Sequence, residues 1–287
     1  MGIDLHAHTT ASDGSFTPRE LVQHATVRGL GAVAVTDHDT FGGHEEALAA
    51  GSELGVEIVP GIELSVKDER GDKSHLLGYY VKRGGALEQQ LDFLQAERKA
   101  RNVVILDKLA SLGVPVSMAR VEEISRGGVM GRPHIAQALM ERGYVQSVQE
   151  AFDRFLADGS AAAASKEVLH PAEAIDLIHD GGGVAIWAHP TRPPSKRGAE
   201  PVDFEAWEAK LRVWIEWGVD GLEIYYSQYT PAEASWTAQM AGKYGLLGTG
   251  GSDFHGVSKP LIELGVTHTG EPVPDSVLAA LKARKNR

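Results

Sequence analysis

Residues 2–8 read Gly-Ile-Asp-Leu-His-Ala-His, an apolar stretch that ends in two histidines with one residue between them. Side chains two positions apart in a β-strand point to the same face, so His6 and His8 can reach one cation. Neutral imidazole is a suitable ligand for zinc, iron and manganese. Taken alone, such a pair is more often two surface histidines near a chain end. It predicts a metal site because the rest of the chain repeats the same arrangement.

An apolar strand that ends in His, Asp or Glu recurs in four later segments. These are residues 32–38 with Asp37 and His38, residues 57–66 with Glu63, residues 184–190 with His189, and residues 246–255 with Asp253 and His255. Helices are predicted between them, and the first begins near Thr17, which can cap it, with Glu20 completing a capping box. Strand, helix, strand, helix in this order is typical of parallel βαβ units. Reactive residues of α/β barrels gather at the C-terminal ends of the strands, so we expect these side chains to meet at one rim.

Between residues 86 and 165, helical periodicity continues without intervening strands. This segment is too long for a barrel crossover, so the sequence predicts a helical insertion at residues 86–165 in a barrel of residues 1–85 and 166–287. Within it, Arg132-Pro133-His134 lies at a predicted helix N-terminus, whose free N–H groups favour an anion. The alternative interpretation of Arg132 and His134 is a solvated arginine and a polar residue on a helix surface. Near the chain end, residues 264–269 are predicted as a strand, and a helix follows from about residue 274.

Length and composition limit the class of protein. With 287 residues and 43% hydrophobic content, the chain can bury a large core. The net charge of −11 argues against a broad nucleic-acid-binding surface, so no stable nucleic-acid partner is expected. A small phosphorylated substrate remains compatible, because bound cations can be the largest local charges in a site. No cysteine is present, so any metal must be held by nitrogen and oxygen ligands. Without a leader or an apolar run of membrane-spanning length, the protein is expected to be cytoplasmic and to have no membrane partner.

Taken together, the ligand-type residues resemble the motifs of the PHP (polymerase and histidinol phosphatase) family, in the family's order along the chain. The motifs that carry the resemblance are His6-x-His8, Asp13, Asp37-His38, Gly61-x-Glu63, His75, Ala-His189-Pro and Ser-Asp253-x-His255. The insertion with Gly-Arg-Pro-His is similar to the family branch of nucleoside 3′,5′-bisphosphate phosphatases, which also trim RNA from its 5′ end.

The resemblance implies an α/β fold, a distorted (β/α)7 TIM-like barrel, with up to three divalent metal ions on its rim. By position, the first metal would be held by His6, His8, Glu63 and Asp253, the second by the bridging Glu63 with His75 and His189, and the third by Asp13, His38 and His255. His75 lies at the start of its predicted strand, so its inclusion comes from the resemblance and not from the rim argument. Imidazole and carboxylate ligands fit Mn²⁺, Fe²⁺ and Zn²⁺, of which Mn²⁺ is favoured.

This ligand set predicts a metal-dependent phosphoesterase acting on nucleoside bisphosphates, nucleoside monophosphates or the 5′ ends of short RNA. Two cations bridged by a carboxylate share and acidify a water, and the resulting hydroxide can attack phosphorus in line. Arg132, with His134 and Lys166, would bind the phosphate oxygens that do not react. The residues expected in catalysis are His189, His255 and Asp253. The donor of the leaving-group proton is left open between the two histidines and a metal-bound water. The alternatives are a histidinol-phosphate phosphatase and a non-catalytic metal-binding PHP module.

Overall fold

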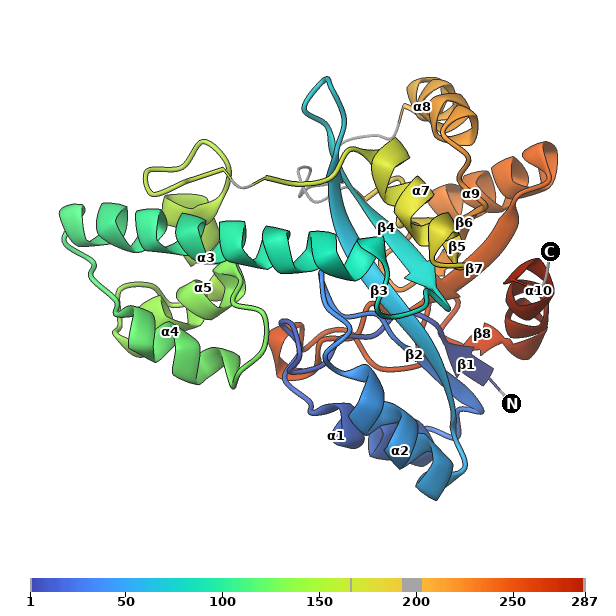
Figure 1. Cartoon of the computed structure of the whole chain (residues 1–287), viewed down its shortest axis with the longest axis horizontal. Helices are drawn as coiled ribbons and strands as arrows, with labels where there is room; N and C mark the ends of the chain where they lie inside the picture. The colour runs from blue at the N-terminus through green and yellow to red at the C-terminus, as the bar shows by residue number, and fades with distance from the viewer. Residues whose placement is uncertain (1, 166, 193–202, 286–287) are drawn as a thin grey trace.

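A computed structural model describes residues 2–165, 167–192 and 203–285. Its strands form one sheet in the order β7-β6-β5-β4-β3-β2-β1-β8. They are β1 (Gly2–Asp4), β2 (Ala32–Val35), β3 (Glu57–Lys67), β4 (Lys73–Tyr79), β5 (Val184–Ala188), β6 (Gly221–Tyr226), β7 (Leu247–Gly251) and β8 (Val273–Pro274). The sheet curls until the residues after β1 meet β7, where the Leu5 N–H donates to the Gly250 carbonyl at 3.1 Å. Strands β1–β7 thus form the nearly closed barrel that was predicted, and β8 adds a short antiparallel pair to β1 (Figure 1).

β4 has a direction that the hydrophobic pattern did not predict. It is antiparallel to both β3 and β5. Residues 68–72 make a tight turn, and a connection this short cannot hold the crossover that parallel neighbours need. As a result, the start of β4, with His75, lies at the same end of the barrel as the C-terminal ends of β3 and β5.

Helices cover the outside of the barrel and one of its ends (Figure 1). Those outside the insertion are α1 (Pro18–Val27), α2 (His44–Leu54), α7 (Pro171–Asp180), α8 (Phe204–Glu216), α9 (Pro231–Tyr244), α10 (Asp275–Lys285) and the 3-10 turn η2 (Gly256–Ser258). α1 begins with the predicted capping box of Thr17 and Glu20. Successive side chains of β2 point to opposite faces of the sheet. Ala32 therefore packs in the core inside the barrel, whereas Val33 packs in the core formed with α1 and α2.

The predicted helical insertion contains α3 (Ala86–Ser111), α4 (Met118–Ser125), α5 (Arg132–Glu141), α6 (Val148–Ala151) and the π-helix η1 (Phe152–Leu156). These helices extend to one side of the barrel, and the first turns of α3 lie against it (Figure 1). Their apolar side chains form a cluster separate from the barrel cores, which includes Ile105, Ile135 and Phe155. We therefore keep the proposal that residues 86–165 form a subdomain.

The predicted strand at residues 264–269 was wrong. This segment consists of turns, with the Val266 N–H donating to the Glu263 carbonyl at 3.2 Å and the Gly270 N–H to the Thr267 carbonyl at 3.0 Å. Pairing with β1 occurs further along, in β8, and the last helix then begins at Asp275. Among the helices that the structure describes, none has the length and apolar character needed to cross a membrane.

Candidate metal centre and active site

The ligand-type side chains identified in the sequence gather at one rim of the barrel, although they come from widely separated segments. They are His6 and His8 after β1, Asp13 in the next loop, His38 after β2, Glu63 in β3, His75 in β4, His189 after β5, and Asp253 and His255 after β7. Strands β1, β2, β3, β5 and β7 deliver them in or beyond their C-terminal halves, as expected for a barrel active site.

Glu63 is the centre of this cluster and is only 1% exposed. Its Oε1 lies 2.8 Å from His75 Nδ1 and 3.1 Å from His189 Nε2. Its Oε2 lies 3.1 Å from His38 Nδ1 and 3.3 Å from His8 Nε2. A carboxylate with imidazoles facing both of its oxygens has the arrangement needed to bridge two cations.

Two further carboxylates complete the cluster. Asp253 Oδ1 lies 3.3 Å from His8 Nε2 and 3.6 Å from His6 Nε2. Asp13 Oδ1 lies 3.2 Å from His255 Nε2. Asp13 Oδ1 also lies 3.9 Å from His8 Nδ1, so the carboxylates of Asp253 and Asp13 lie near different nitrogens of the His8 ring.

Buried polar atoms without a hydrogen-bond partner among the described residues are concentrated in this cluster. The six found here are His6 Nε2, His8 Nδ1, His8 Nε2, Asp13 Oδ1, His38 Nδ1 and Glu63 Oε2. Each unpaired buried polar atom costs about 1–3 kcal/mol, so six in one place need another group to satisfy them. Divalent cations meet that need, and the nitrogen and oxygen donors fit Mn²⁺, Fe²⁺ or Zn²⁺.

The structure brings the ligand-type atoms into three groups, in each of which the atoms lie within 4.8 Å of one another. The groups are His6, His8, Glu63 and Asp253; His8, Asp13, His38 and His255; and His38, Glu63 and His75. The first equals the set expected for the first metal, and the second adds His8 to the set expected for the third. In the remaining group His38 takes the position expected for His189, whose Nε2 is still 3.1 Å from Glu63 Oε1.

Charge and burial oppose each other in the cluster. Burial raises the pKa of the Glu63 carboxyl, but the nearby imidazoles of His75, His38 and His6 bring it well below its usual range. Burial lowers the pKa of His8, but the carboxylates of Asp253 and Glu63, each with an oxygen 3.3 Å from His8 Nε2, raise it to about 9. A cation that binds His8 must displace this proton, so cation binding is expected to release protons and to weaken as the pH falls.

Asp37, which follows β2, supports a neighbouring loop. Its carboxylate accepts hydrogen bonds from the Thr9 N–H and hydroxyl, both at 2.7 Å, and from the Ser12 hydroxyl at 2.6 Å. These bonds hold the loop that carries Asp13. Asp37 thus shapes the loop that follows β1.

The proposed phosphate-binding residues have different environments. Arg132, at the start of α5, binds the Leu156 carbonyl at 2.9 Å and Asp158 at 3.2 Å. His134 is buried, and its Nδ1 accepts from the Gly131 N–H at 2.9 Å, which places its remaining proton on Nε2. Lys166 lies outside the described residues.

A cavity of about 110 Å³ lies beside the cluster of ligand-type residues at the rim (the rim cluster), between β4 and the insertion. Its lining includes His75 of the cluster together with the cationic side chains of Lys73, Arg101 and Arg132. Asp158 is the acidic residue at this cavity and pairs with both Lys73 and Arg132. The cavity joins the ligand-type cluster to a surface with an excess of positive charge, which suits an anionic group of a substrate.

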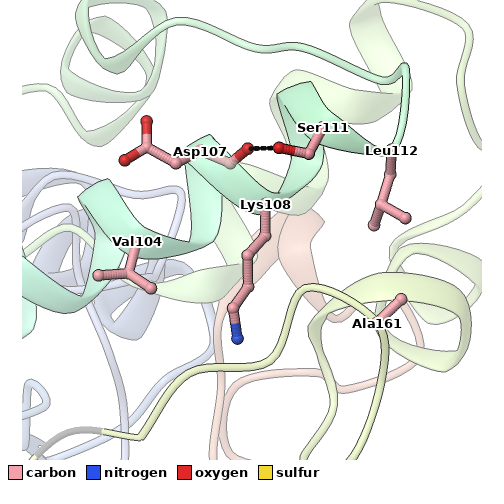
Figure 2. Close-up of a pocket in the computed structure, with 6 residues that line it drawn as sticks. All are labelled: Val104, Asp107, Lys108, Ser111, Leu112 and Ala161. Atoms are coloured by element: carbon pink, nitrogen blue, oxygen red, sulfur yellow. Dashed lines mark hydrogen bonds between the residues drawn. The ribbon is translucent and has the colours of Figure 1, made fainter.

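A larger hollow, of about 330 Å³, lies on the outer part of α3 (Figure 2). It is lined by Val104, Asp107, Lys108, Ser111, Leu112 and Ala161, of which Ser111 and Asp107 are joined by a hydrogen bond. None of these lining residues belongs to the cluster at the barrel rim, so the hollow is not the candidate active site.

Sequence reasoning missed several residues that support the cluster. Asp253 Oδ2 accepts from the Tyr226 hydroxyl at 3.0 Å and from Lys259 Nζ at 2.7 Å, which leaves Oδ1 facing the histidines. Glu223, in the middle of β6, binds His6 through a side-chain contact of 3.0 Å. The sequence contained one sign that Glu223 has a role: it is a carboxylate inside an otherwise apolar strand, and a buried charge needs partners.

Comparison with known proteins agrees with this geometry. The family model described as PHP domain matches residues 4–157. A 5′-3′ exoribonuclease of Haemophilus influenzae is 37% identical over 254 residues, which cover 88% of this chain and 89% of the relative. A phosphoribosyl 1,2-cyclic phosphate 1,2-diphosphodiesterase of Eggerthella lenta is 32% identical, covering 88% and 94%. A 3′,5′-nucleoside bisphosphate phosphatase of Chromobacterium violaceum is 27% identical, covering 98% and 97%.

A solved structure from Bifidobacterium adolescentis, assigned as a metal-dependent phosphoesterase, matches the whole fold. The TM-score is 0.88 at 30% sequence identity, and the match covers 99% of this chain and 96% of the other. The fold is therefore similar to that of a metal-dependent phosphoesterase.

Proposed function

Because this chain belongs to the PHP domain family of metal-dependent phosphoesterases, and is thus a hydrolase of phosphoester bonds, we propose that it acts on nucleotides and the 5′ ends of short RNA. One observation carries the proposal that the rim cluster is its active site. Six buried donor and acceptor atoms of Glu63 and its neighbours converge there without hydrogen-bond partners among the described residues.

The side chains of the cluster would hold up to three divalent cations, with Glu63 shared between two of them. When bound, the cations supply Lewis-acid polarisation of phosphate oxygens and lower the pKa of a coordinated water. Mn²⁺ is our preferred ion, because the ligands mix imidazole and carboxylate donors.

The hydrogen bonds of His189 and His255 support a ligand role for both residues. Nδ1 of His189 faces the Arg192 carbonyl at 3.1 Å, and Nδ1 of His255 faces the Asp253 carbonyl at 2.9 Å. Since a carbonyl only accepts, the proton of each neutral ring lies on Nδ1 and the lone pair on Nε2 points into the cluster. We therefore propose that both histidines, with Asp253, act in catalysis by holding metal rather than by donating the leaving-group proton.

We propose that the substrate's non-reacting phosphate oxygens bind in the cavity beside His75, where Arg132 and Arg101 supply positive charge. His134, which has a donor proton on Nε2, and Lys166 are kept as further phosphate ligands. The nucleotide and RNA substrates of two relatives support this choice.

A single assay series tests the proposal. Metal analysis of the purified protein is combined with two kinds of assay. Phosphate release is measured with adenosine 3′,5′-bisphosphate, adenosine monophosphate and histidinol phosphate. Chromatography of the products is used with a 5′-phosphorylated RNA oligomer and a ribosyl 1,2-cyclic phosphate, since cleavage of a phosphodiester yields a monoester. We expect the bisphosphate or the RNA to have the highest kcat/KM. Faster hydrolysis of histidinol phosphate would favour that activity instead. Faster hydrolysis of the cyclic phosphate would favour the reaction of the Eggerthella lenta relative. Metal binding without turnover of any substrate would indicate a non-catalytic module.

Replacing Arg132 by alanine tests the phosphate-binding role. Loss of one charged hydrogen-bond partner of a phosphate costs about 1.5–3 kcal/mol, so the Arg132→Ala protein is expected to have a KM raised about 10- to 100-fold with the best substrate. Its kcat should change less, because the metal ligands stay in place. Arg120→Ala is the control, since Arg120 is an exposed arginine of the same insertion that pairs with Glu123 and Glu141. Equal KM values for wild-type and Arg132→Ala proteins would remove Arg132 from this role.

A further inference from the structure

Glu223 is a carboxylate inside the barrel wall. It lies in β6, is 0% exposed, and sits at an irregularity where the pairing of β6 with β7 shifts register between Glu223 and Tyr225. A buried carboxylate is costly unless its oxygens are fully used, so its partners indicate its purpose.

The two carboxylate oxygens of Glu223 bind two different residues of the rim cluster. Oε1 lies 3.0 Å from Nδ1 of His6, and Oε2 accepts from the backbone N–H of His189 at 2.8 Å. Among the described residues, Glu223 belongs to none of the three groups that could hold an ion. With both oxygens occupied by N–H donors, Glu223 is placed to orient ligands and not to bind a cation itself.

The contact with His6 determines which ring nitrogen faces the cluster. An ionised carboxylate only accepts, so the proton of the neutral His6 ring lies on Nδ1 and its lone pair lies on Nε2. That Nε2 is 3.4 Å from Glu63 and 3.6 Å from Asp253. A carboxylate behind a ligand imidazole fixes the ring and makes it a better donor to metal.

The contact with His189 acts on the backbone. His189 has φ of +28°, a left-handed conformation that is unfavourable for a residue with a side chain. The charge-assisted bond from its N–H to Glu223 offsets part of that cost. In this conformation the ring lies with Nε2 3.1 Å from Glu63 Oε1.

Glu223 is itself held in place from the outer side of the strand. The Tyr229 hydroxyl donates to its backbone carbonyl at 3.1 Å. We propose that Glu223 is a positioning residue that directs the ligand atoms of His6 and His189, from β1 and β5, toward one metal cluster. This inference rests on the metal site proposed above.

The Glu223→Gln variant tests this inference. Glutamine keeps the shape of the glutamate side chain but has one acceptor oxygen for the two N–H donors of His6 and His189. We expect the affinity for Mn²⁺, measured by competition with a chelator of known affinity, to fall about 10- to 100-fold. At saturating Mn²⁺, kcat should fall while KM stays within about twofold of wild type, because the phosphate-binding residues are untouched.

Asp220→Asn is the matched control. Asp220 is a buried carboxylate immediately before β6, and it also binds a backbone N–H (Ala185, 2.8 Å) and an imidazole (His179, 2.8 Å). Both variants are expected to lose thermal stability, but Asp220→Asn should keep its Mn²⁺ affinity.

The outcomes separate this inference from the proposed function. If the wild-type protein binds no divalent cation, the proposed metal site fails. If the wild type binds Mn²⁺ and Glu223→Gln binds it within about twofold of the same affinity, only the role of Glu223 is overturned. If the Glu223→Gln protein does not fold, the Glu223→Asp variant tests the same role. Its carboxylate is withdrawn by one methylene, so an affinity loss of about tenfold is expected and an unchanged affinity overturns the inference.

Discussion

Replacing Glu63 by glutamine is expected to lower kcat about 10³-fold or more and to reduce the bound metal. The carboxylate lies between five imidazoles, and the closest distance is 2.8 Å to His75. An amide supplies one weaker oxygen ligand in place of two charged ones, so no group remains that can bridge two cations. Polarisation of the phosphate by metal is worth several kcal/mol, and each 1.36 kcal/mol lost from transition-state stabilisation is tenfold in rate.

The measurement combines steady-state kinetics with the metal content per chain. The control is Glu57→Gln, because Glu57 lies on the same strand, is exposed at the opposite end of the barrel and pairs with Lys282. Both variants should retain the native circular dichroism spectrum. Glu63→Gln protein with wild-type kcat and full metal content would contradict the assignment of the rim cluster as the active site.

Removing the metal is expected to abolish turnover and to destabilise the fold. A ligand present at about 1,000 times its Kd stabilises the native state by about 4 kcal/mol. For a chain of this size, that corresponds to a fall in Tm of about 8 °C after chelation. The physical origin is the set of buried imidazole and carboxylate atoms, which lose the cations that satisfy them.

Differential scanning calorimetry before and after chelation tests this expectation, with Mn²⁺, Fe²⁺ or Zn²⁺ added back one at a time. The ion that restores both Tm and kcat at the lowest concentration identifies the preferred metal. In Glu63→Gln protein, the Tm shift caused by the chelator should be much smaller. Full turnover by protein with less than about 0.1 metal ion per chain would be inconsistent with metal-dependent catalysis.

The family and the barrel could be predicted because the necessary information is local in the sequence. A buried strand is a short apolar run, a helix start is a capping residue, and a rim residue is a polar side chain where the run ends. His6, His38 and His189 were found in this way, and the structure brings all three close to Glu63.

His75 shows where that local information ends. Its place at the start of an apolar run excluded it from the rim argument, and only the family resemblance included it. The structure supplies the reason: β4 is antiparallel to its neighbours, so its beginning lies where their C-terminal ends lie. The direction of a strand depends on the length of its connection and on its partner strand. It cannot be predicted from the hydrophobic periodicity of the strand itself.

The sequence by itself determined the βα units, the ligand types and the helical insertion, because these follow from hydrophobic periodicity and side-chain chemistry. Only the tertiary structure decided which residues support the ligands. Glu223 contacts His6 across 217 positions of sequence, and Asp37 binds Thr9 and Ser12 instead of an imidazole. Arg132 pairs with Asp158 for the same reason. Contacts of this kind arise when the sheet closes and the insertion folds back, since a buried polar group takes whichever partner the packing brings within reach.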